Sequence, residues 1–468
     1  MRKDPSPTLG ADLSFVRTLC VINKEVFGLK QEMKKSLGML QGLALVVGMI
    51  IGSGIFLKPG VVLQNAGSPV MALIAWVVGG IVTLASALSI AEIAANIPKA
   101  GGLYIYLEDL YGPKWGFLLG WVQSIISYPA SVAAQAIAFA TYAANFVSMN
   151  TWEQRYLAIG ILVFILTLNI LSTKFGGFVQ VAATIGKLVP IVAILATGFV
   201  KGMLPGAAGM STVLIGKSAT GAAILGTLWA YDGWIGVTNM AGEMTNPKKN
   251  LPRVISIGII FVIAVYAVFN IVAFNTLPAA ELAASDKPGF DVAQALFGEG
   301  GTIFLTIGIM ISVFGALNGY LMTAARVPQA MAARGQLPMA KVIGAVHTKL
   351  GTPTNALIMQ SVLAVIYILS GSFNTLTDML IFVLWIFFVL GVVGVFILRK
   401  KGLSDKNGYR VPLYPMVPLV GALGGSFILV STLISAPTLS LIGIGITLVG
   451  LPVYYLLQKK NKNELVSG

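Results

Sequence analysis

The chain has 468 residues, of which 56% are hydrophobic and only 10% are charged, whereas soluble domains carry about 25% charged residues. This composition excludes an ordinary soluble enzyme, a disordered chain and a secreted disulfide scaffold, and it predicts an all-α polytopic membrane protein. The single cysteine, Cys20, excludes an internal disulfide and a cysteine metal site, and the single histidine, His347, excludes His-based zinc sites and most Ser-His or Cys-His catalysis. We therefore expect no catalytic residue, no metal and no cofactor.

Apolar runs long enough to cross a bilayer, about 20 residues each, recur along the chain and predict twelve transmembrane helices. They cover residues 38–64, 70–96, 115–147, 155–172, 179–200, 219–241, 254–277, 300–328, 355–371, 376–398, 415–434 and 437–457. Polar tails are expected over residues 1–35 and 458–468.

The distribution of basic residues predicts the orientation of these helices. Of the 31 lysines and arginines, 25 fall in the two tails and the even-numbered loops, and five, including Lys58, fall in the odd-numbered loops. Because cytoplasmic loops are enriched in basic residues, we expect both termini in the cytoplasm and the protein in the cell (plasma) membrane. The net charge of +14 then follows from orientation, and no nucleic acid partner is expected.

Two spans are interrupted by small residues near their middle. The first carries Gly52-Ser53-Gly54, and the sixth reads Trp229 to Gly236 with Asp232 at membrane depth, where an acid is costly unless it faces protein or water. Alone, the first run would indicate close packing of helices. Paired interruptions at corresponding positions of two halves indicate the binding site of a transporter.

The spacing of the interruptions predicts two five-helix halves, residues 36–200 and 218–398, followed by two further helices within 411–457. A broken helix exposes N–H groups that attract a carboxylate and C=O groups that attract an ammonium. Two facing breaks can therefore bind the backbone of an α-amino acid without any charged side chain.

Four motifs together resemble the L-amino acid transporter family of the amino acid–polyamine–organocation superfamily. They are Ile50–Phe56 (IIGSGIF), Trp229–Trp234 (WAYDGW), the loop Gly242–Pro252, and Phe314–Gly319 followed by Ala325-Arg326. Within that family the chain looks most like bacterial alanine/serine/cysteine-type exchangers.

The resemblance implies the leucine-transporter fold, with a 5+5 inverted repeat plus two helices. It also implies sodium-independent exchange of small neutral L-amino acids (alanine, serine, cysteine, threonine) by alternating access. A proton-coupled amino acid symporter that uses Lys187 is the alternative, and a non-transporting receptor or scaffold is a third reading. An enzyme is not expected.

The resemblance also assigns substrate-binding residues, which lie at both breaks. They are Ile50, Gly52, Ser53, Gly54, Trp229, Ala230 and Asp232. The N–H groups of Ser53 and Gly54 would hold the carboxylate, with Gly52 permitting close approach. Carbonyls near Ile50 and those of Trp229, Ala230 and Asp232 would hold the ammonium. Trp229 stands where the family has an aromatic gate.

Lys187 lies nearly mid-span in the fifth predicted helix, too deep for its side chain to reach either end easily. In the resembling family a helix-five lysine lies near the first break, where sodium-coupled relatives hold an ion, which implies sodium independence. Tyr231 and Asn318 are further gating or coupling candidates, although Tyr231 could equally pack and Asn318 could equally hydrogen-bond across helices or approach Lys187. Asp378 is interpreted as a solvated surface acid.

The expected partners are small neutral L-amino acids and the lipid bilayer. Eukaryotic relatives attach a heavy chain through a cysteine after the third helix, and the corresponding loop, Ser148 to Arg155, contains none. We therefore predict no disulfide-linked heavy chain and a chain that functions as a monomer. Residues 1–32 hold no apolar span and are predicted to be dispensable.

Overall fold

The computed structural model describes residues 37–97, 101–171, 173–201, 219–241, 244–347, 350–371, 373–405 and 408–467. The predicted N-terminal tail with Cys20, and residues 242–243 of the loop motif Gly242–Pro252, lie outside the described residues. Within them the regular structure is helical, and the only β contact is an isolated bridge between Leu37 and Met244.

The helices of the first part of the chain follow the predicted spans closely. They are α2 Met39–Ile50, α3 Gly54–Ala66, α4 Pro69–Asn96, α5 Leu103–Tyr111, α6 Pro113–Val122, the π-helix η1 Gln123–Ser127, α7 Tyr128–Ala143, α8 Thr151–Leu171 and α9 Thr173–Val200. Local sequence sets the junction between α3 and α4. Gly67 leaves α3 with a positive φ of 77°, and Ser68 caps α4 by accepting the Met71 N–H at 3.3 Å.

The second part of the chain adds the remaining helices. They are α10 Thr220–Ala230, α11 Gly236–Asn239, α12 Pro247–Thr276, α13 Ala279–Ala284, α14 Pro288–Ala324, α15 Arg326–Ala332, α16 Ala340–Ile343, α17 Thr354–Ser370, α18 Phe373–Lys400, α19 Met416–Ser435 and α20 Pro437–Ser467. The span expected from residue 300 begins earlier, since α14 starts at Pro288 and continues through a non-helical kink at Gly298. The predicted C-terminal tail continues α20.

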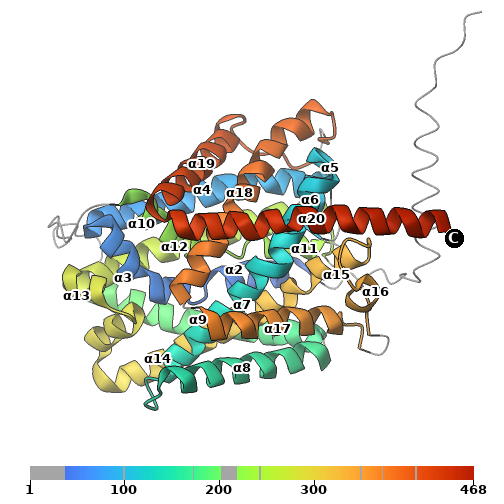
Figure 1. Ribbon diagram of the computed structural model, residues 1–468. Coiled ribbons are helices and arrows are strands. Elements are labelled where there is room, and N and C mark those ends of the chain that lie inside the picture. Colours follow the sequence, from blue (N-terminus) through green and yellow to red (C-terminus); the bar gives the residue numbers. More distant parts are fainter. Residues whose placement is uncertain are drawn as a thin grey trace, which may run out of the picture.

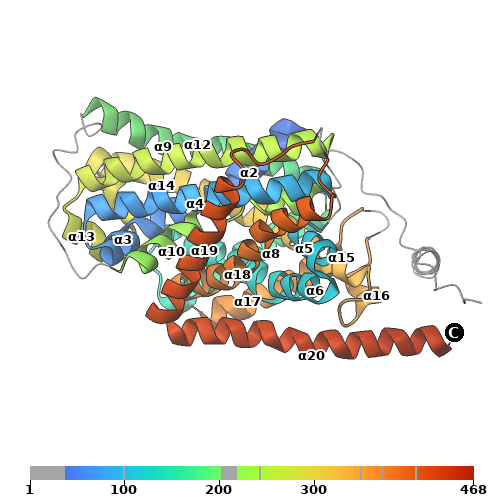
Figure 2. The ribbon, with the colours of Figure 1, turned by 90° about the horizontal axis from the view of Figure 1, so that it is seen from above.

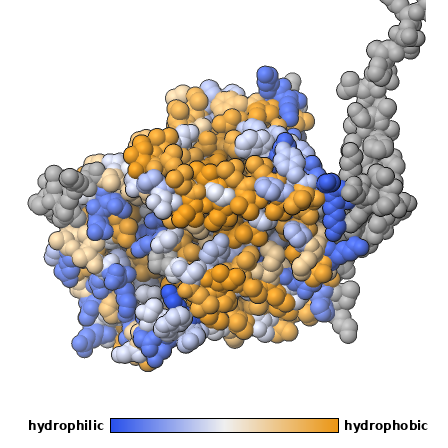
Figure 3. All heavy atoms as spheres, viewed as in Figure 1, coloured by the Kyte–Doolittle hydropathy of each residue, from blue (hydrophilic) through white to orange (hydrophobic). Residues whose placement is uncertain are grey.

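The molecule is a polytopic membrane protein. Ten helical segments of the described chain are long and apolar enough to span a bilayer, and Thr220–Ala230 and Thr354–Ser370 are shorter apolar helices. Figure 3 shows apolar side chains gathered across the middle of one face, over α20 and its neighbours, with hydrophilic side chains towards both ends. The total of twelve crossings stays a prediction.

The long helices run roughly side by side, and the broken helices lie among them (Figure 1). Figure 2 shows α20 on the outside of the bundle, on the edge opposite α9 and α12. α12 packs against α4 and α2, and α14 packs against α9 and α7. Long helices therefore surround the breaks and shield them from the outside of the molecule.

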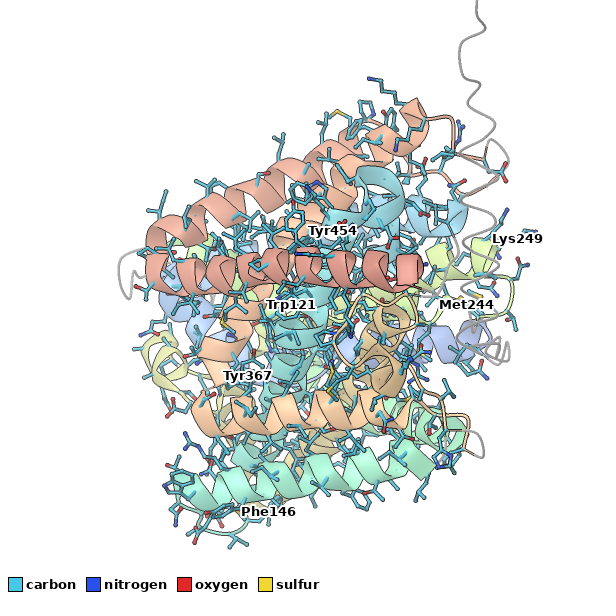
Figure 4. All side chains as sticks on the ribbon, turned by 45° about the vertical axis from the view of Figure 1, so that its right-hand side comes forward. Trp121, Phe146, Met244, Lys249, Tyr367 and Tyr454 are labelled. Carbon is cyan, nitrogen blue, oxygen red and sulfur yellow. The ribbon has the colours of Figure 1, made fainter. Side chains whose placement is uncertain are left out.

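Side chains on the outer helices tie the layers together. Trp121 Nε1 on α6 donates to the carbonyl of Ile446 on α20 at 3.2 Å, and Tyr454 of α20 packs on Phe117 of α6. Trp121 and Tyr454 are seen beside α20 in Figure 4, where Lys249 and Met244 lie towards the end of the bundle opposite Phe146. α20 is thus held to the bundle by side-chain contacts.

A buried carboxylate joins α4, α18 and the segment after α18. Glu92 accepts hydrogen bonds from Arg399 Nε at 2.9 Å and Nη2 at 2.8 Å, from Ser404 Oγ at 3.1 Å and from the Val411 N–H at 2.7 Å. Four bonds satisfy both carboxylate oxygens, which is what a fully buried charge requires. This cluster fixes one end of α4 against one end of α18.

Candidate functional site

The first break lies between α2 and α3. α2 ends at Ile50, α3 begins at Gly54, and the intervening residues Ile51, Gly52 and Ser53 are buried and non-helical. Ile51 has an extended conformation with ψ of 90°, so the chain leaves the helix before it starts the next one. The interruption predicted from Gly52-Ser53-Gly54 is present.

The second break lies between α10 and α11. α10 ends at Ala230 and the chain turns through Tyr231–Ile235 before α11 begins at Gly236. Gly233 adopts φ of 107°, which side-chain-bearing residues rarely adopt. The WAYDGW segment therefore forms the predicted interruption.

The two breaks are in direct contact. A Cβ on Gly54 would lie 2.6 Å from Ala230 Cα, and a Cβ on Gly233 would lie 3.0 Å from Met49 Cβ. Both glycines are therefore needed for the close approach of the two broken helices. Gly54 packs against the backbone of the other break, so a valine there would push α3 and α10 apart.

The carbonyl ends of the two breaks meet at one hydroxyl. Tyr266 Oη, on α12, lies 2.9 Å from the carbonyl oxygen of Ile50 and 2.8 Å from that of Ala230. A phenol has a single proton to donate, so it can fully satisfy one of these two buried acceptors at a time. This arrangement brings Ile50 and Ala230 together and leaves acceptor capacity for an ammonium.

The amide end of the first break faces α7. The N–H of Ser53 donates to Gln135 Oε1 at 3.3 Å. The Ser53 hydroxyl is buried and has no hydrogen-bond partner among the described residues. Hydrogen-bonding groups at this end of α3 are thus aimed at the space between α3 and α7.

Lys187 of α9 is fully buried and reaches the carbonyl side of the first break. Its Nζ donates to the carbonyl of Gly48 at 2.6 Å and to that of Ile51 at 2.5 Å. Ser312 Oγ of α14 lies 3.4 Å from the same Ile51 oxygen. The ammonium therefore ties α9 to the point where α2 ends.

The two other gating candidates make contacts of different kinds. Asn318 Nδ2 donates to Gln180 Oε1 at 3.1 Å, and Asn318 Oδ1 accepts from Asn169 Nδ2 at 2.9 Å. Of the two alternatives for Asn318, the structure therefore has the hydrogen bonds across helices. Tyr231 Oη donates to the carbonyl of Trp76 on α4 at 3.1 Å. Asn318 joins α14 to α8 and α9, whereas Tyr231 fastens the second break to α4.

Aromatic rings surround the second break. Trp229 stacks on Tyr320 with centroids 6.3 Å apart and meets the edge of Phe373 at 5.9 Å. Tyr320 Oη donates to Asp232 Oδ2 at 2.9 Å. The carboxylate is buried and joined to α14 by this bond, which provides the protein partner that an acid at membrane depth needs.

The interpretation of Lys58 as a loop lysine and of Asp378 as a solvated acid is wrong. Lys58 lies inside α3 with 0% of its side chain exposed, and its Nζ lies 3.0 Å from Asp378 Oδ1 on α18, whose side chain is 31% exposed. Lys58 Nζ also donates to Asn374 Oδ1 at 3.1 Å and Thr377 Oγ1 at 3.0 Å. Because the two charges lie 320 residues apart in sequence, neither could be assigned a partner from its own segment.

A cavity of about 330 Å³ lies beside this cluster, lined in part by Leu57, Arg155, Asp286, Phe373 and Asn374. Phe373 links the cavity to the second break, because its ring contacts Trp229 and also lies 5.5 Å from Lys58 Nζ. Lys58 therefore contacts two residues that line the cavity, Asn374 and Phe373. Through Phe373 and Trp229, the Lys58–Asp378 pair is connected to the second break.

Four residues at or near the breaks were not predicted from the sequence: Gln135, Tyr266, Gln180 and Tyr320. Each is a buried polar side chain in an apolar helix, and such residues often hydrogen-bond between membrane helices. That signal marks them as candidates but does not say which break they contact. Among the residues described, no three His, Cys, Asp or Glu side chains lie close enough together to hold a metal ion.

Paired broken helices in contact inside a polytopic bundle define a class of membrane transport protein. The chain matches the family model described as amino acid permease over residues 37–456. It therefore belongs to the amino acid permease family, within the amino acid–polyamine–organocation superfamily.

Its relatives are transporters as well. The chain is 44% identical to the serine/threonine exchanger SteT of Bacillus subtilis (strain 168), over 92% of this chain and 98% of that protein. It is 31% identical to the human cystine/glutamate transporter, over 93% and 87% of the two chains. It is 33% identical to the mouse large neutral amino acids transporter small subunit 2, over 91% and 81%. The chain is thus a transporter and not an enzyme, as predicted.

Proposed function

We propose that the protein is a sodium-independent exchanger of small neutral L-amino acids, with alanine, serine, cysteine and threonine as substrates. The observation that carries the proposal is the meeting of the two breaks, where the carbonyls of Ile50 and Ala230 share the hydroxyl of Tyr266. Carbonyls beside N–H groups at one place suit a zwitterion. The fit is to the part that all α-amino acids share.

Within this proposal the amino acid binds through backbone groups. Its carboxylate accepts from the N–H groups of Ser53 and Gly54 at the start of α3, where the helix dipole favours a negative charge. Its ammonium donates to carbonyls at the ends of α2 and α10, including those of Trp229, Ala230 and Asp232. The rings of Tyr320 and Phe373 both pack against Trp229, which favours short substrate side chains.

Sodium independence rests on Lys187. Its ammonium already donates hydrogen bonds to the carbonyls of Gly48 and Ile51, which a bound cation would otherwise coordinate. A fixed positive charge there supports transport that needs no sodium. The same lysine makes a proton-coupled symporter the alternative, because a buried amine can also exchange its proton.

Alternating access requires two related halves, and we propose the leucine-transporter arrangement, with repeats in residues 36–200 and 218–398 and two added helices in 411–457. A break in the first helix of each proposed half supports this division. The distribution of basic residues supports cytoplasmic termini in the plasma membrane. The chain is proposed to work alone, as a monomer without a disulfide-linked heavy chain.

The Bacillus relative is a serine/threonine exchanger, which supports hydroxyl amino acids as the substrates to test first. The experiment is transport by the purified chain in liposomes loaded with one unlabelled amino acid at a time. We expect labelled serine or alanine to enter only when the lumen contains a substrate amino acid, equally with and without sodium or a pH gradient. Uptake into empty liposomes driven by a pH gradient would replace the exchanger by the symporter, and no uptake under any condition would refute both.

A further inference from the structure

The structure places a side chain at the very N–H group that the proposed substrate needs. Gln135, on α7, is only 2% exposed, and its Oε1 accepts the N–H of Ser53 at 3.3 Å. The same amide group lies against Gly52, since a Cβ on that glycine would be 2.9 Å from Gln135 Nε2 and 3.3 Å from Oε1. The absence of a side chain at Gly52 is therefore what allows the amide to reach Ser53.

Two acceptors compete for one donor at this position. A backbone N–H has a single proton, and a carboxylate bound at the start of α3 would need the proton that Gln135 Oε1 now accepts. A carboxylate forms the stronger bond, because charge-assisted hydrogen bonds are shorter and roughly twice as strong as neutral ones. The amide oxygen of Gln135 can therefore be displaced by a substrate carboxylate, whereas an uncharged group would gain little by replacing it.

We propose that Gln135 is a stand-in for the substrate carboxylate, a positioning residue that holds the Ser53 N–H until an α-amino acid displaces it. The inference rests on the proposed function, because it assumes that the carboxylate binds at Ser53. It extends that function by making displacement of the amide the step that selects carboxylate-bearing ligands over simple amines. It also removes the penalty of a buried unpaired N–H when no amino acid is bound.

Nearby groups can receive the displaced amide. The hydroxyls of Ser53 and of Ser131 are both buried and lack a hydrogen-bond partner within the part of the chain that the structure describes. Ser131 precedes Gln135 by four residues on α7, so the two side chains share one face of the helix. A rotation of the Gln135 side chain along that face would exchange the Ser53 N–H for a serine hydroxyl.

The test is the affinity of the purified full-length protein for L-serine and L-alanine, measured by calorimetry in detergent, for the wild type and Gln135→Leu. Leucine has a similar size but no acceptor, so the amino acid no longer competes for the N–H. We expect both amino acids to bind about three- to tenfold more tightly, with a lower melting temperature in their absence and a larger rise on their addition. Unchanged or weaker binding by a folded Gln135→Leu protein would overturn the proposal.

A matched control separates this effect from the loss of any buried glutamine. Gln360 of α17 is also fully buried, and its Nε2 donates to the carbonyl of Ser124 at 2.9 Å, away from Ser53. Gln360→Leu is expected to lower the melting temperature without tightening amino acid binding. Equal tightening in both variants would show that Gln135 has no special position and would overturn the proposal.

A second variant decides the question if Gln135→Leu does not fold. Gln135→Glu keeps the length of the side chain but places a carboxylate at the Ser53 N–H, so a substrate must displace a stronger acceptor of its own charge. We expect at least tenfold weaker binding of serine and alanine, and unchanged or tighter binding would overturn the proposal. Failure of the wild type to bind any amino acid would instead refute the proposed function.

Discussion

Replacing Lys187 by methionine removes the two hydrogen bonds that join α9 to the end of α2, while keeping an unbranched side chain of similar bulk. The carbonyls of Gly48 and Ile51 then lose a donor that lies 2.6 Å and 2.5 Å away in the wild type. The Ile51 oxygen keeps a second neighbour, Ser312 Oγ at 3.4 Å, whereas the Gly48 oxygen has no other side-chain donor among the residues that the structure describes. The Gly48 carbonyl is therefore the group that loses most.

A buried acceptor left without a donor costs about 1–3 kcal/mol. At about 1.4 kcal/mol for each factor of ten, the loss at Gly48 alone corresponds to roughly a five- to 150-fold change in the balance of conformations that keep and break this contact. We expect exchange by Lys187→Met in liposomes to fall at least tenfold. Sodium should not restore the exchange rate, because the Ser312 hydroxyl and the two freed carbonyls are too few oxygen ligands for a sodium site.

The assay compares initial exchange rates of labelled serine in sodium and in choline buffers at equal protein density. Lys201→Met is the matched control, because Lys201 lies at the end of the same helix and its Nζ also donates to a backbone carbonyl, that of Leu296, at 3.0 Å. We expect this variant to exchange at close to the wild-type rate. Lys187→Arg should rescue only in part, since a planar guanidinium is larger and presents its donors differently. Wild-type exchange by Lys187→Met would refute the reasoning, and sodium activation of that variant would refute the argument for sodium independence.

Three further predictions concern other parts of the chain. Asp378→Asn removes the negative charge that pairs with Lys58 and should make it easier for α3 and α18 to separate. We therefore expect the ratio of external to internal KM, measured in oriented liposomes, to fall about three- to tenfold. An unchanged ratio would show that this ion pair has no part in gating. Tyr320→Phe removes the hydroxyl bound to Asp232 and should destabilise the protein by about 1–3 kcal/mol, measured by thermal unfolding in detergent, and an unchanged melting temperature would contradict the role given to this bond. Truncation to Met33 should leave exchange at the wild-type rate, because the removed segment holds no apolar span; a large loss of activity would show that it has a function.

The positions of the two breaks could be predicted because the cause is local. Gly52-Ser53-Gly54 and the turn at Gly233 carry weak helix formers in otherwise apolar runs, and the structure has both interruptions there. Lys187 was predictable for a related reason, since a lone charge deep in an apolar span must find polar groups. The resemblance to a known family indicated which break it would reach.

The partners of other side chains could not be predicted, because they depend on packing between distant segments. Gln135 lies 82 residues from Ser53, and the Lys58–Asp378 pair spans 320 residues. Counting Lys58 among the loop residues was reasonable for a charge near the end of an apolar run, yet three polar partners on α18 allow it to be buried. One sequence states which residues are polar and where each span lies, but not which faces of two helices meet.

The bonds to Glu92 have a consequence for how the molecule moves. Because one carboxylate holds Arg399, Ser404 and Val411 at once, the adjoining ends of α4 and α18 cannot separate without exposing a buried charge. These two helices therefore behave as one rigid frame at that end, and the hinge of any rocking motion must lie elsewhere. The two breaks lie outside this frame, and there α2 and α10 are linked to α3 and α11 by only a few non-helical residues.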